Sequence, residues 1–166
     1  AMVPQQVNLF SGTIRENLLL ADPNANDEKL KEALSEAGLG SFLKTLPKGL
    51  DSDVGNAGAA LSGGQCQKMG IARALLSEAQ YMIFDEATSS VDPQSEREIW
   101  ETIGRLSKTR TLIIISHRMS TIQNANCIYV LEKGVVAQRG SHAELMQQGG
   151  LYRELVTRQQ AMEVAE

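Results

Sequence analysis

The sequence predicts an α/β fold in which a parallel β-sheet follows a helical N-terminal half. Two apolar runs support this prediction, Tyr81-Met82-Ile83-Phe84 and Thr111–Ile115, and the first is short enough to be a strand buried on both faces. A helical segment lies between them, and strand, helix, strand is the pattern of a parallel βαβ unit. The 166 residues are 42% hydrophobic and 22% charged, as in an ordinary globular domain.

The composition disfavours several classes of protein. A net charge of −4 is unfavourable for nucleic acid or an anionic membrane as the main partner. The two cysteines, Cys66 and Cys127, lack metal or redox spacing, which favours a reducing compartment over a disulfide framework. No apolar run approaches the ~18 residues of a membrane span, and no signal peptide opens the chain. We therefore expect a soluble chain whose partners do not include nucleic acid.

Helical signals dominate the N-terminal half. Helices are expected over Ile14–Leu20, residues 27–38 and Ser41–Leu46. Asp27 is a suitable N-cap for the second helix, and Gly38 lies where a C-cap is expected. The stretch Pro47–Ala60 holds three glycines without a clear period, so we expect a loop there.

The C-terminal half alternates helices with strands. A long helix is expected over about Gly63–Ser77, and Asp92 caps the next helix, with Pro93 in its first position. The buried stripe of that helix consists of Ile99, Ile103 and Leu106. Further elements are expected over residues 119–124 (helix), 127–131 and 135–139 (strands joined by a turn), and 142–147 and 151–162 (helices).

Two adjacent carboxylates, Asp85 and Glu86, stand where the first apolar run ends. At the exit of a buried strand such a pair is costly unless a cation compensates it. In a nucleotide hydrolase that cation is Mg²⁺, held by the first acid, while the second acid orients and polarises the attacking water. A strand that simply reaches the surface at two acids is an equally good alternative.

A pair of glycines precedes the long helix, within Leu61-Ser62-Gly63-Gly64-Gln65. Ser62 is a suitable N-cap, and the glycines leave backbone N–H groups open to a close ligand. Because a helix N-terminus carries roughly +0.5 of an elementary charge, the segment predicts a phosphate site. The alternative is a capped helix with a flexible start, but two glycines there cost stability, which favours the ligand.

A histidine, His117, follows the second apolar run, at the edge of the sheet where Asp85 and Glu86 are expected. At that place its ring can donate a hydrogen bond to a terminal phosphate. The simpler alternative, taking the residue by itself, is a lone surface histidine.

In order and spacing these segments resemble the ATPase domains of ABC transporters. Leu61-Ser62-Gly63-Gly64-Gln65 is similar to the signature motif, and Tyr81–Glu86 to the Walker B strand with its catalytic glutamate. The D-loop, the switch histidine and the Q-loop are similar to residues 87–92, Ser116-His117-Arg118 and Val3-Pro4-Gln5. The resemblance covers nearly the whole chain, and residues 13–17 and 116–122 are most similar to the exporter branch.

The resemblance implies a partial P-loop NTPase (RecA-like) parallel sheet with an α-helical subdomain. Residues 1–8 would be a Q-loop remnant, residues 9–78 the helical (signature) subdomain, and residues 79–166 the C-terminal part of the ATPase core. The parent protein would bind ATP and Mg²⁺ at the cytoplasmic face of the cell membrane and couple ATP hydrolysis to transmembrane transport. Its partners would be a transmembrane domain and a second ATP-binding domain, placed head to tail.

The resemblance also implies a role for each motif. Asp85 would serve Mg²⁺, Glu86 would act as general base, and Gln5 would sense Mg²⁺ and water. His117 would stabilise the γ-phosphate, and Asp92 would link the two sites of the dimer. The residues expected to contact ATP held by the partner are Leu61, Ser62, Gly63, Gly64 and Gln65.

Three residues depart from the family's pattern. Cys66 stands where the family often has arginine, Gly70 where alanine is usual, and Asn56 where exporters commonly have glutamate. These departures are expected to weaken the signature helix or its coupling while leaving the groups named above in place.

The 166 residues contain no P-loop of the form G-x-x-x-x-G-K-S/T and no Gly-Lys pair. We therefore expect a fragment that has no useful ATPase activity alone. Loss of the P-loop strand is expected to expose a strand edge and apolar surface, with self-association or an altered fold as the result. One alternative is a naturally short, non-catalytic module that lends its signature motif to a complete partner. A DNA-repair ATPase of the same family is disfavoured by the acidic charge.

Overall fold

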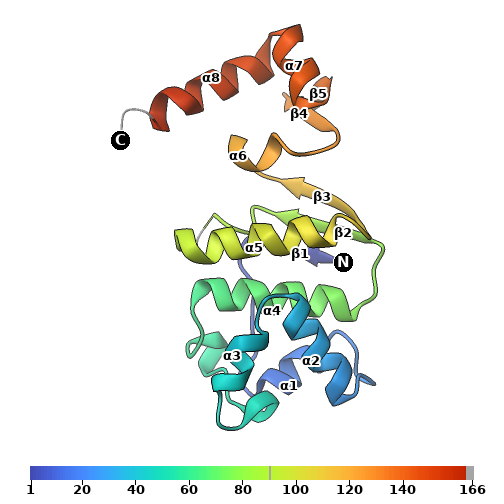
Figure 1. Cartoon of the computed structure of the whole chain (residues 1–166), viewed down its shortest axis with the longest axis vertical. Helices are drawn as coiled ribbons and strands as arrows, with labels where there is room; N and C mark the ends of the chain where they lie inside the picture. The colour runs from blue at the N-terminus through green and yellow to red at the C-terminus, as the bar shows by residue number, and fades with distance from the viewer. Residues whose placement is uncertain (90, 164–166) are drawn as a thin grey trace. The chain divides into compact units, whose positions relative to one another are not determined.

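The computed structural model describes residues 1–89 and 91–163. They form two compact units, one over residues 1–115 and one from Ser116 onward (Figure 1). Of the helices in these described ranges, none combines the length and apolar character of a membrane span. The first unit contains most of the candidate site residues, and His117 lies in the second.

The first unit contains three short helices followed by two long ones. The helices are α1 (Ile14–Leu19), α2 (Asp27–Glu36), α3 (Gly40–Thr45), α4 (Gly63–Leu76) and α5 (Pro93–Leu106). All five were expected from the sequence, with ends that differ by one or two residues. The expected loop over Pro47–Ala60 also contains two short 3₁₀ turns, η1 (Gly49–Asp51) and η2 (Asn56–Gly58), so that expectation was incomplete.

The N-cap of α2 differs from the prediction. Asn26, and not Asp27, has extended backbone angles, and its side chain accepts a hydrogen bond from the backbone N–H of Lys29 at 2.9 Å. Asp27 instead lies in the first turn of α2, where its carboxylate pairs with Arg15. Both residue types cap helices well, so residue type alone did not distinguish these two neighbours.

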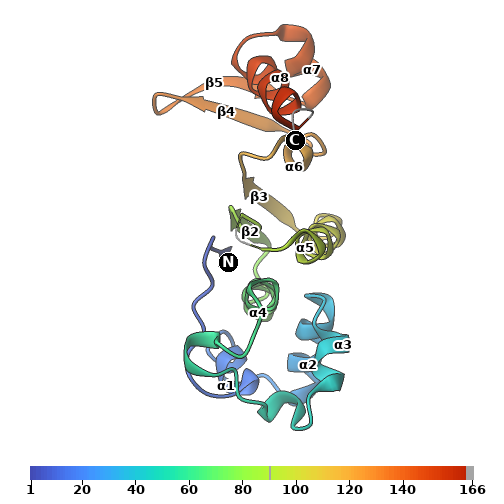
Figure 2. The ribbon, with the colours of Figure 1, turned by 90° about the vertical axis from the view of Figure 1, so that its left-hand side faces the viewer.

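The three strands of the first unit, β1 (Met2–Val3), β2 (Tyr81–Asp85) and β3 (Thr111–Ile115), form a parallel sheet in the order β1-β2-β3 (Figure 2). The sequence predicted β2 and β3. It did not predict β1, whose two residues are too short for a periodic pattern and pair with Ile83 and Phe84 of β2. This pairing places Gln5, two residues beyond β1, beside the carboxyl end of β2.

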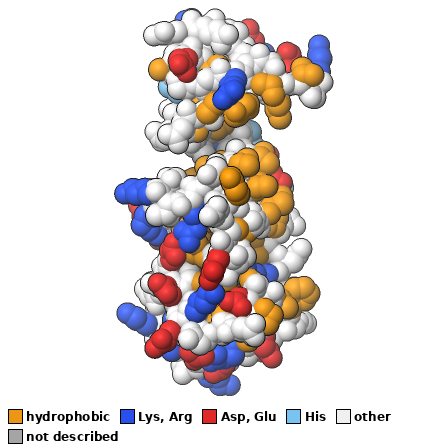
Figure 3. Space-filling view, turned by 90° about the vertical axis from the view of Figure 1, so that its right-hand side faces the viewer, with side chains coloured by type: hydrophobic (Ala, Val, Ile, Leu, Met, Phe, Trp, Pro, Cys, Tyr) orange, Lys and Arg blue, Asp and Glu red, His pale blue; other side chains and the backbone are white. Residues whose placement is uncertain are grey.

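The sheet is buried on one face only. Met82 and Phe84 are fully buried in a core shared with α4 and α5, which pack on that face (Figure 2). On the other face Tyr81 is 64% exposed, and Ile113 and Ile115 are each 49% exposed. Figure 3 shows hydrophobic side chains gathered over this region. The expectation that the first strand is buried on both faces is therefore wrong, because the helices of this unit cover a single side.

The second unit is an antiparallel hairpin packed against helices. Its elements are α6 (Met119–Ile122), β4 (Ile128–Glu132), β5 (Val135–Gly140), α7 (His142–Gln148) and α8 (Leu151–Glu163). A tight turn at Lys133 and Gly134, both with positive φ, joins the strands as expected. Its own small core includes Leu145, Tyr152 and Val156, which are at most 2% exposed.

Candidate functional site

The carboxyl end of β2 is where the first unit brings polar side chains together. Asp85 is the last residue of β2, and Glu86 follows directly. The side-chain amide of Gln5 donates to Glu86 Oε2 at 3.3 Å and to Ser89 Oγ at 3.0 Å. Residues about 80 positions apart thus meet at the end of one strand. The glutamine expected in the Q-loop is therefore hydrogen-bonded to the glutamate expected to be catalytic.

The backbone at Glu86 has an unusual conformation. Its φ is +47°, in the left-handed region that side chains other than glycine rarely adopt. Two hydrogen bonds fix the residue, from Glu86 N–H to the carbonyl of Ile115 at 2.9 Å and from Ser89 N–H to the Glu86 carbonyl at 3.0 Å. Such conformations often occur at functional sites, where the surrounding structure holds them in place. The turn directs the chain away from the sheet at the carboxylate pair.

The signature-like segment forms the N-terminus of α4. Ser62 is the N-cap, and it shares a capping box with Gln65: Ser62 Oγ accepts from Gln65 N–H, and Gln65 Oε1 accepts from Ser62 N–H. The Ser62 hydroxyl keeps its own proton for a further acceptor, because it uses an oxygen lone pair for the cap. Gly63 beside it is exposed, so this helix end is open to a ligand.

One glycine of that segment has a packing role. A Cβ atom at Gly64 would lie 2.3 Å from Ser95 Oγ and 2.4 Å from Ser95 Cβ. Gly64 is accordingly buried, and the N-termini of α4 and α5 meet at Ser95. Both glycines were expected to serve a ligand, and this contact supplies a structural reason for Gly64.

Asp92 caps α5, as expected. Its carboxylate accepts from the backbone N–H groups of Gln94 at 3.1 Å and Ser95 at 2.9 Å. Hydrogen bonds from the side chain and backbone of Ser95, together with that of Gln94, lower the pKa of Asp92. Ser95 therefore contacts both the signature glycine and the D-loop aspartate. Ser90, the fourth residue of the expected D-loop, lies outside the described residues.

Several residues that support the site were missed by the sequence analysis. Gln67 of α4, only 5% exposed, donates through Nε2 to the carbonyl oxygens of Pro4, at 3.3 Å, and Gln5. Lys68 of α4 is buried and pairs with Glu98 of α5. Ser95 was also missed, and Ser89 was expected only as part of the D-loop, with no partner assigned to it. The buried face of α4 was the available signal, but nothing in the sequence identified what those side chains would meet.

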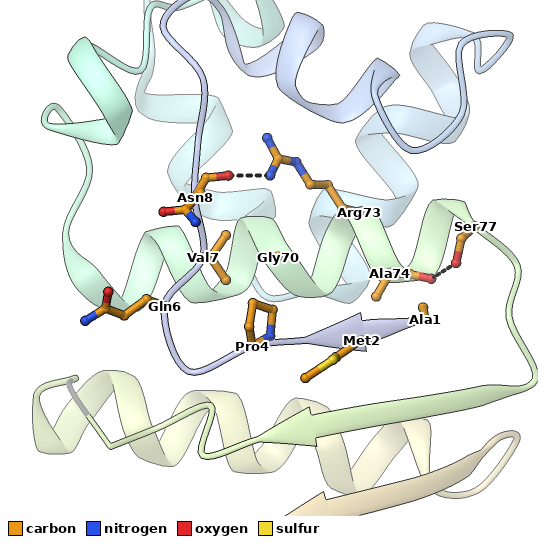
Figure 4. Close-up of a pocket in the computed structure, with 10 residues that line it drawn as sticks. All are labelled: Ala1, Met2, Pro4, Gln6, Val7, Asn8, Gly70, Arg73, Ala74 and Ser77. Carbon is orange, nitrogen blue, oxygen red and sulfur yellow. Dashed lines mark hydrogen bonds between the residues drawn. The ribbon is translucent and has the colours of Figure 1, made fainter.

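A groove runs along α4 beside the strand that leads to Gln5. Its volume is about 340 Å³, and its lining includes Val7, Gly70 and Arg73 (Figure 4). A Cβ at Gly70 would lie 2.5 Å from Val7 Cγ2, so the glycine permits close packing here. Arg73 donates to the Asn8 carbonyl at 2.7 Å and to Asn17 at 2.8 and 2.6 Å. The departure at Gly70 thus has a packing explanation.

The other departures make ordinary contacts. Cys66 lies against the Gly58 carbonyl, with Sγ 3.9 Å from the oxygen, and burial raises the pKa of its thiol. Asn56 accepts a hydrogen bond from Ser11 Oγ at 2.9 Å. His117 belongs to the second unit, two residues beyond the end of β3. Its expected place beside the carboxylates stays a prediction.

The donor set at the end of β2 fits a nucleotide-bound Mg²⁺. Asp85 and Glu86 supply carboxylate oxygens and Gln5 an amide oxygen, which are the ligand types that this ion prefers. Within the described ranges, no three His, Cys, Asp or Glu side chains gather into a metal site. Mg²⁺ in nucleotide sites is typically held by one or two carboxylates plus phosphates and waters, so the small set is suitable.

Known proteins match this chain closely. The family model of ABC transporters matches residues 1–89. P-glycoprotein 14 of Caenorhabditis elegans is 45% identical over 159 residues, covering 96% of this chain and 12% of that protein. An ATP-dependent lipid A-core flippase of Chromobacterium violaceum is 46% identical over 155 residues, covering 93% of this chain and 26% of that protein.

A solved structure agrees with these matches. A bacterial Atm1-family ABC exporter with ATP bound aligns with a TM-score of 0.87 at 38% identity, over 96% of this chain and 28% of that one. The chain therefore spans between about an eighth and somewhat over a quarter of the length of these relatives. It belongs to the ABC transporter family and represents part of an exporter-type ATP-binding domain.

Proposed function

We propose that these residues form the signature and Walker B part of a motor domain that hydrolyses ATP to drive export. The observation that carries the proposal is the pair of hydrogen bonds from Gln5 to Glu86 and Ser89. They join the expected Q-loop to the expected general base at the end of a parallel strand, where open α/β sheets bind ligands. ATP bound in the related exporter supports nucleotide as the ligand.

Each residue takes a distinct part in the proposed reaction. Mg²⁺, when bound, neutralises the charge that develops on the phosphates. Asp85 and Gln5 would hold it, and Glu86, fixed by its bond from Gln5, would accept a proton from the attacking water. His117 would donate to the γ-phosphate, and Asp92, while capping α5, would link the two sites of the dimer.

The signature segment would act on a nucleotide held by a second domain. Ser62 has a proton to donate, Gly63 is exposed, and the end of α4 carries a positive partial charge. We propose that Leu61, Ser62, Gly63, Gly64 and Gln65 contact ATP bound by the partner domain in a head-to-tail dimer. The chain would then comprise the Q-loop segment of residues 1–8, the helical subdomain of residues 9–78 and the C-terminal part of the ATPase core over residues 79–166.

The phosphate-holding lysine must come from outside these 166 residues on this proposal, since they contain no P-loop motif. Positioning and electrostatic stabilisation supply nearly all of the catalysis in phosphoryl transfer. We therefore propose that the 166-residue chain does not turn over ATP by itself. In the parent protein it would work with a transmembrane domain, at the cytoplasmic face of the membrane.

Two experiments test this proposal. Hydrolysis of Mg-ATP by the purified 166-residue chain should equal that of its Glu86→Gln variant, and activity abolished by that substitution would refute inactivity of the chain. Sequencing the DNA upstream should reveal an open frame that encodes a P-loop. A stop codon immediately upstream would instead favour a naturally short module that serves a complete partner.

A further inference from the structure

Gln67 connects the signature helix to the Q-loop. Its side chain projects from α4 and is 5% exposed, and Nε2 donates to the carbonyl oxygens of Pro4 and Gln5. The two acceptors are the carbonyl oxygens of the peptide groups on either side of the Gln5 Cα atom. A single amide therefore fixes the backbone from which the Gln5 side chain extends.

The orientation of the Gln67 amide is set by these acceptors. Two carbonyl oxygens face its nitrogen, so the reversed amide would place oxygen against oxygen. The other end of the amide, Oε1, is buried and makes no hydrogen bond with the described residues. An unpaired buried oxygen is unfavourable, and an apolar side chain of similar size would avoid it. A glutamine at this position is thus explained by the geometry that it imposes on the Q-loop rather than by a gain in stability.

Two neighbours of Gln67 along α4 hold the rest of the same segment. The absent side chain at Gly70 lets Val7 approach the helix, and Arg73 donates to the Asn8 carbonyl (Figure 4). Gln67, Gly70 and Arg73 follow one another at intervals of three residues, so they lie on successive turns of α4. The helix therefore contacts the segment from Pro4 to Asn8 along its length, and Gln67 is the contact nearest to Gln5.

We propose that Gln67 is a positioning residue that aims the Gln5 side chain at Glu86 and Ser89. Through it, a displacement at the N-terminus of α4 would be transmitted to the hydrogen bond on the catalytic carboxylate. The importance of this positioning of Gln5 for catalysis rests on the proposed function. The contact itself is a property of this chain and can be tested without nucleotide.

The test follows the side-chain amide of Gln5 by NMR in the ¹⁵N-labelled 166-residue chain, with the signal identified by its loss in Gln5→Met. Glu86→Gln replaces a charged acceptor by a neutral one, so it should shift the Gln5 amide. In a Gln67→Met background, which keeps the side-chain volume and removes the donor, this shift should fall at least twofold. In a Gln94→Met background, with an exposed glutamine on α5 changed instead, it should persist.

The possible outcomes distinguish the Gln5–Glu86 contact from the positioning role of Gln67. Absence of a Glu86-dependent shift in the chain with Gln67 intact would contradict the Gln5–Glu86 contact and remove the basis of the proposed function. An undiminished shift in the Gln67→Met background would overturn only the positioning role. If Gln67→Met does not fold, Gln67→Leu, which also lacks the donor, decides: a diminished shift in the folded variant supports the role, and an undiminished shift overturns it.

Discussion

Single atoms determine how closely the two long helices of the first unit approach. At Gly64 the absent Cβ leaves room for Ser95, which also bonds to Asp92. One serine thus contacts two residues that the ABC resemblance assigns to different motifs. The geometry of this helix end, which we propose binds phosphate, depends on this small contact. Substitutions at Gly64 can be compared with the same substitution at a glycine whose Cβ position is free of neighbours.

The first prediction concerns Gly64→Ala. The added Cβ would lie 2.4 Å from Ser95 Cβ, so no side-chain rotation relieves the overlap. We expect the free energy of unfolding to fall by about 1–3 kcal/mol, the usual range for overpacking, measured by urea denaturation. Gly104→Ala in α5 is the matched control, since nothing lies within 4 Å of its Cβ position. The free energy of unfolding of the Gly104→Ala variant should rise by about 0.5–1 kcal/mol. An equal rise for Gly64→Ala would contradict the close packing of Gly64 against Ser95.

The second prediction concerns pH and Asp92. Its pKa is lowered in the folded chain, so the carboxylate contributes stability that is present above the ordinary carboxyl pKa of about 4 and is lost as pH falls through the lower folded value. Asp92→Asn keeps a capping side chain without the charge. The difference in urea midpoint between the two chains should be constant from pH 7 to 5 and shrink toward pH 3. A difference that grows on acidification would show that the charge has no stabilising role.

At the scale of elements, α4 organises the site, because the signature-like segment forms its N-terminus and its buried face contacts the segment that leads to and from Gln5. The close approach of Val7 to α4 requires a glycine at position 70, because a Cβ there would lie 2.5 Å from Val7 Cγ2. From the sequence, this glycine was expected to weaken the helix or its coupling. A glycine inside a helix does cost about 1 kcal/mol relative to alanine, and the packing against Val7 accounts for it.

The third prediction is a coupling between these two positions. Gly70→Ala should destabilise the chain when Val7 is present and be tolerated, or even stabilise it, when Val7→Ala is introduced with it. We expect a coupling free energy of about 1–2 kcal/mol, within the range for residues in contact, from a double-mutant cycle of urea unfolding. Additive effects of the two substitutions would mean that α4 does not press against the Q-loop segment at this point.

The elements that could be predicted are those whose signals are local. Ser62 and Asp92 were identified as caps from residue type and spacing, and both cap their helices. By contrast β1 has two residues, and it forms only because β2 offers a parallel partner. The contacts of Gln67 and Ser95 could not be predicted from the sequence either, since they join segments that meet only after folding. The resemblance identified the kinds of residue in the site, and the structure supplied their supports.

At the scale of the whole molecule, apolar surface stays exposed on the sheet. Paired residues of parallel strands share a face, so Met2, Ile83 and Ile113 form one row across it. Met2 and Ile113 are 54% and 49% exposed. Among the strands described, none pairs with the outer edge of β3. An open edge beside an apolar face is a surface suited to association.

The fourth prediction is that the 166-residue chain self-associates through this face. Ile113→Thr keeps a β-branched side chain and removes apolar area, so the association constant should fall several-fold, for a loss of about 1 kcal/mol. Leu20→Thr, which changes an exposed leucine outside the sheet, is the control and should leave association unchanged. Light scattering against concentration measures both. A monodisperse monomer that unfolds cooperatively would contradict the prediction.

The most direct test of the account is ATP hydrolysis by the complete polypeptide encoded around these residues, with and without Glu86→Gln. Loss of a general base typically costs 10²–10⁴-fold in rate, so kcat should fall at least a hundredfold while ATP binding is retained. Glu101→Gln, an exposed glutamate on α5, should hydrolyse ATP at the unchanged rate. A Glu86→Gln protein that retains most of its turnover would show that the carboxylate beside Gln5 is not the catalytic base.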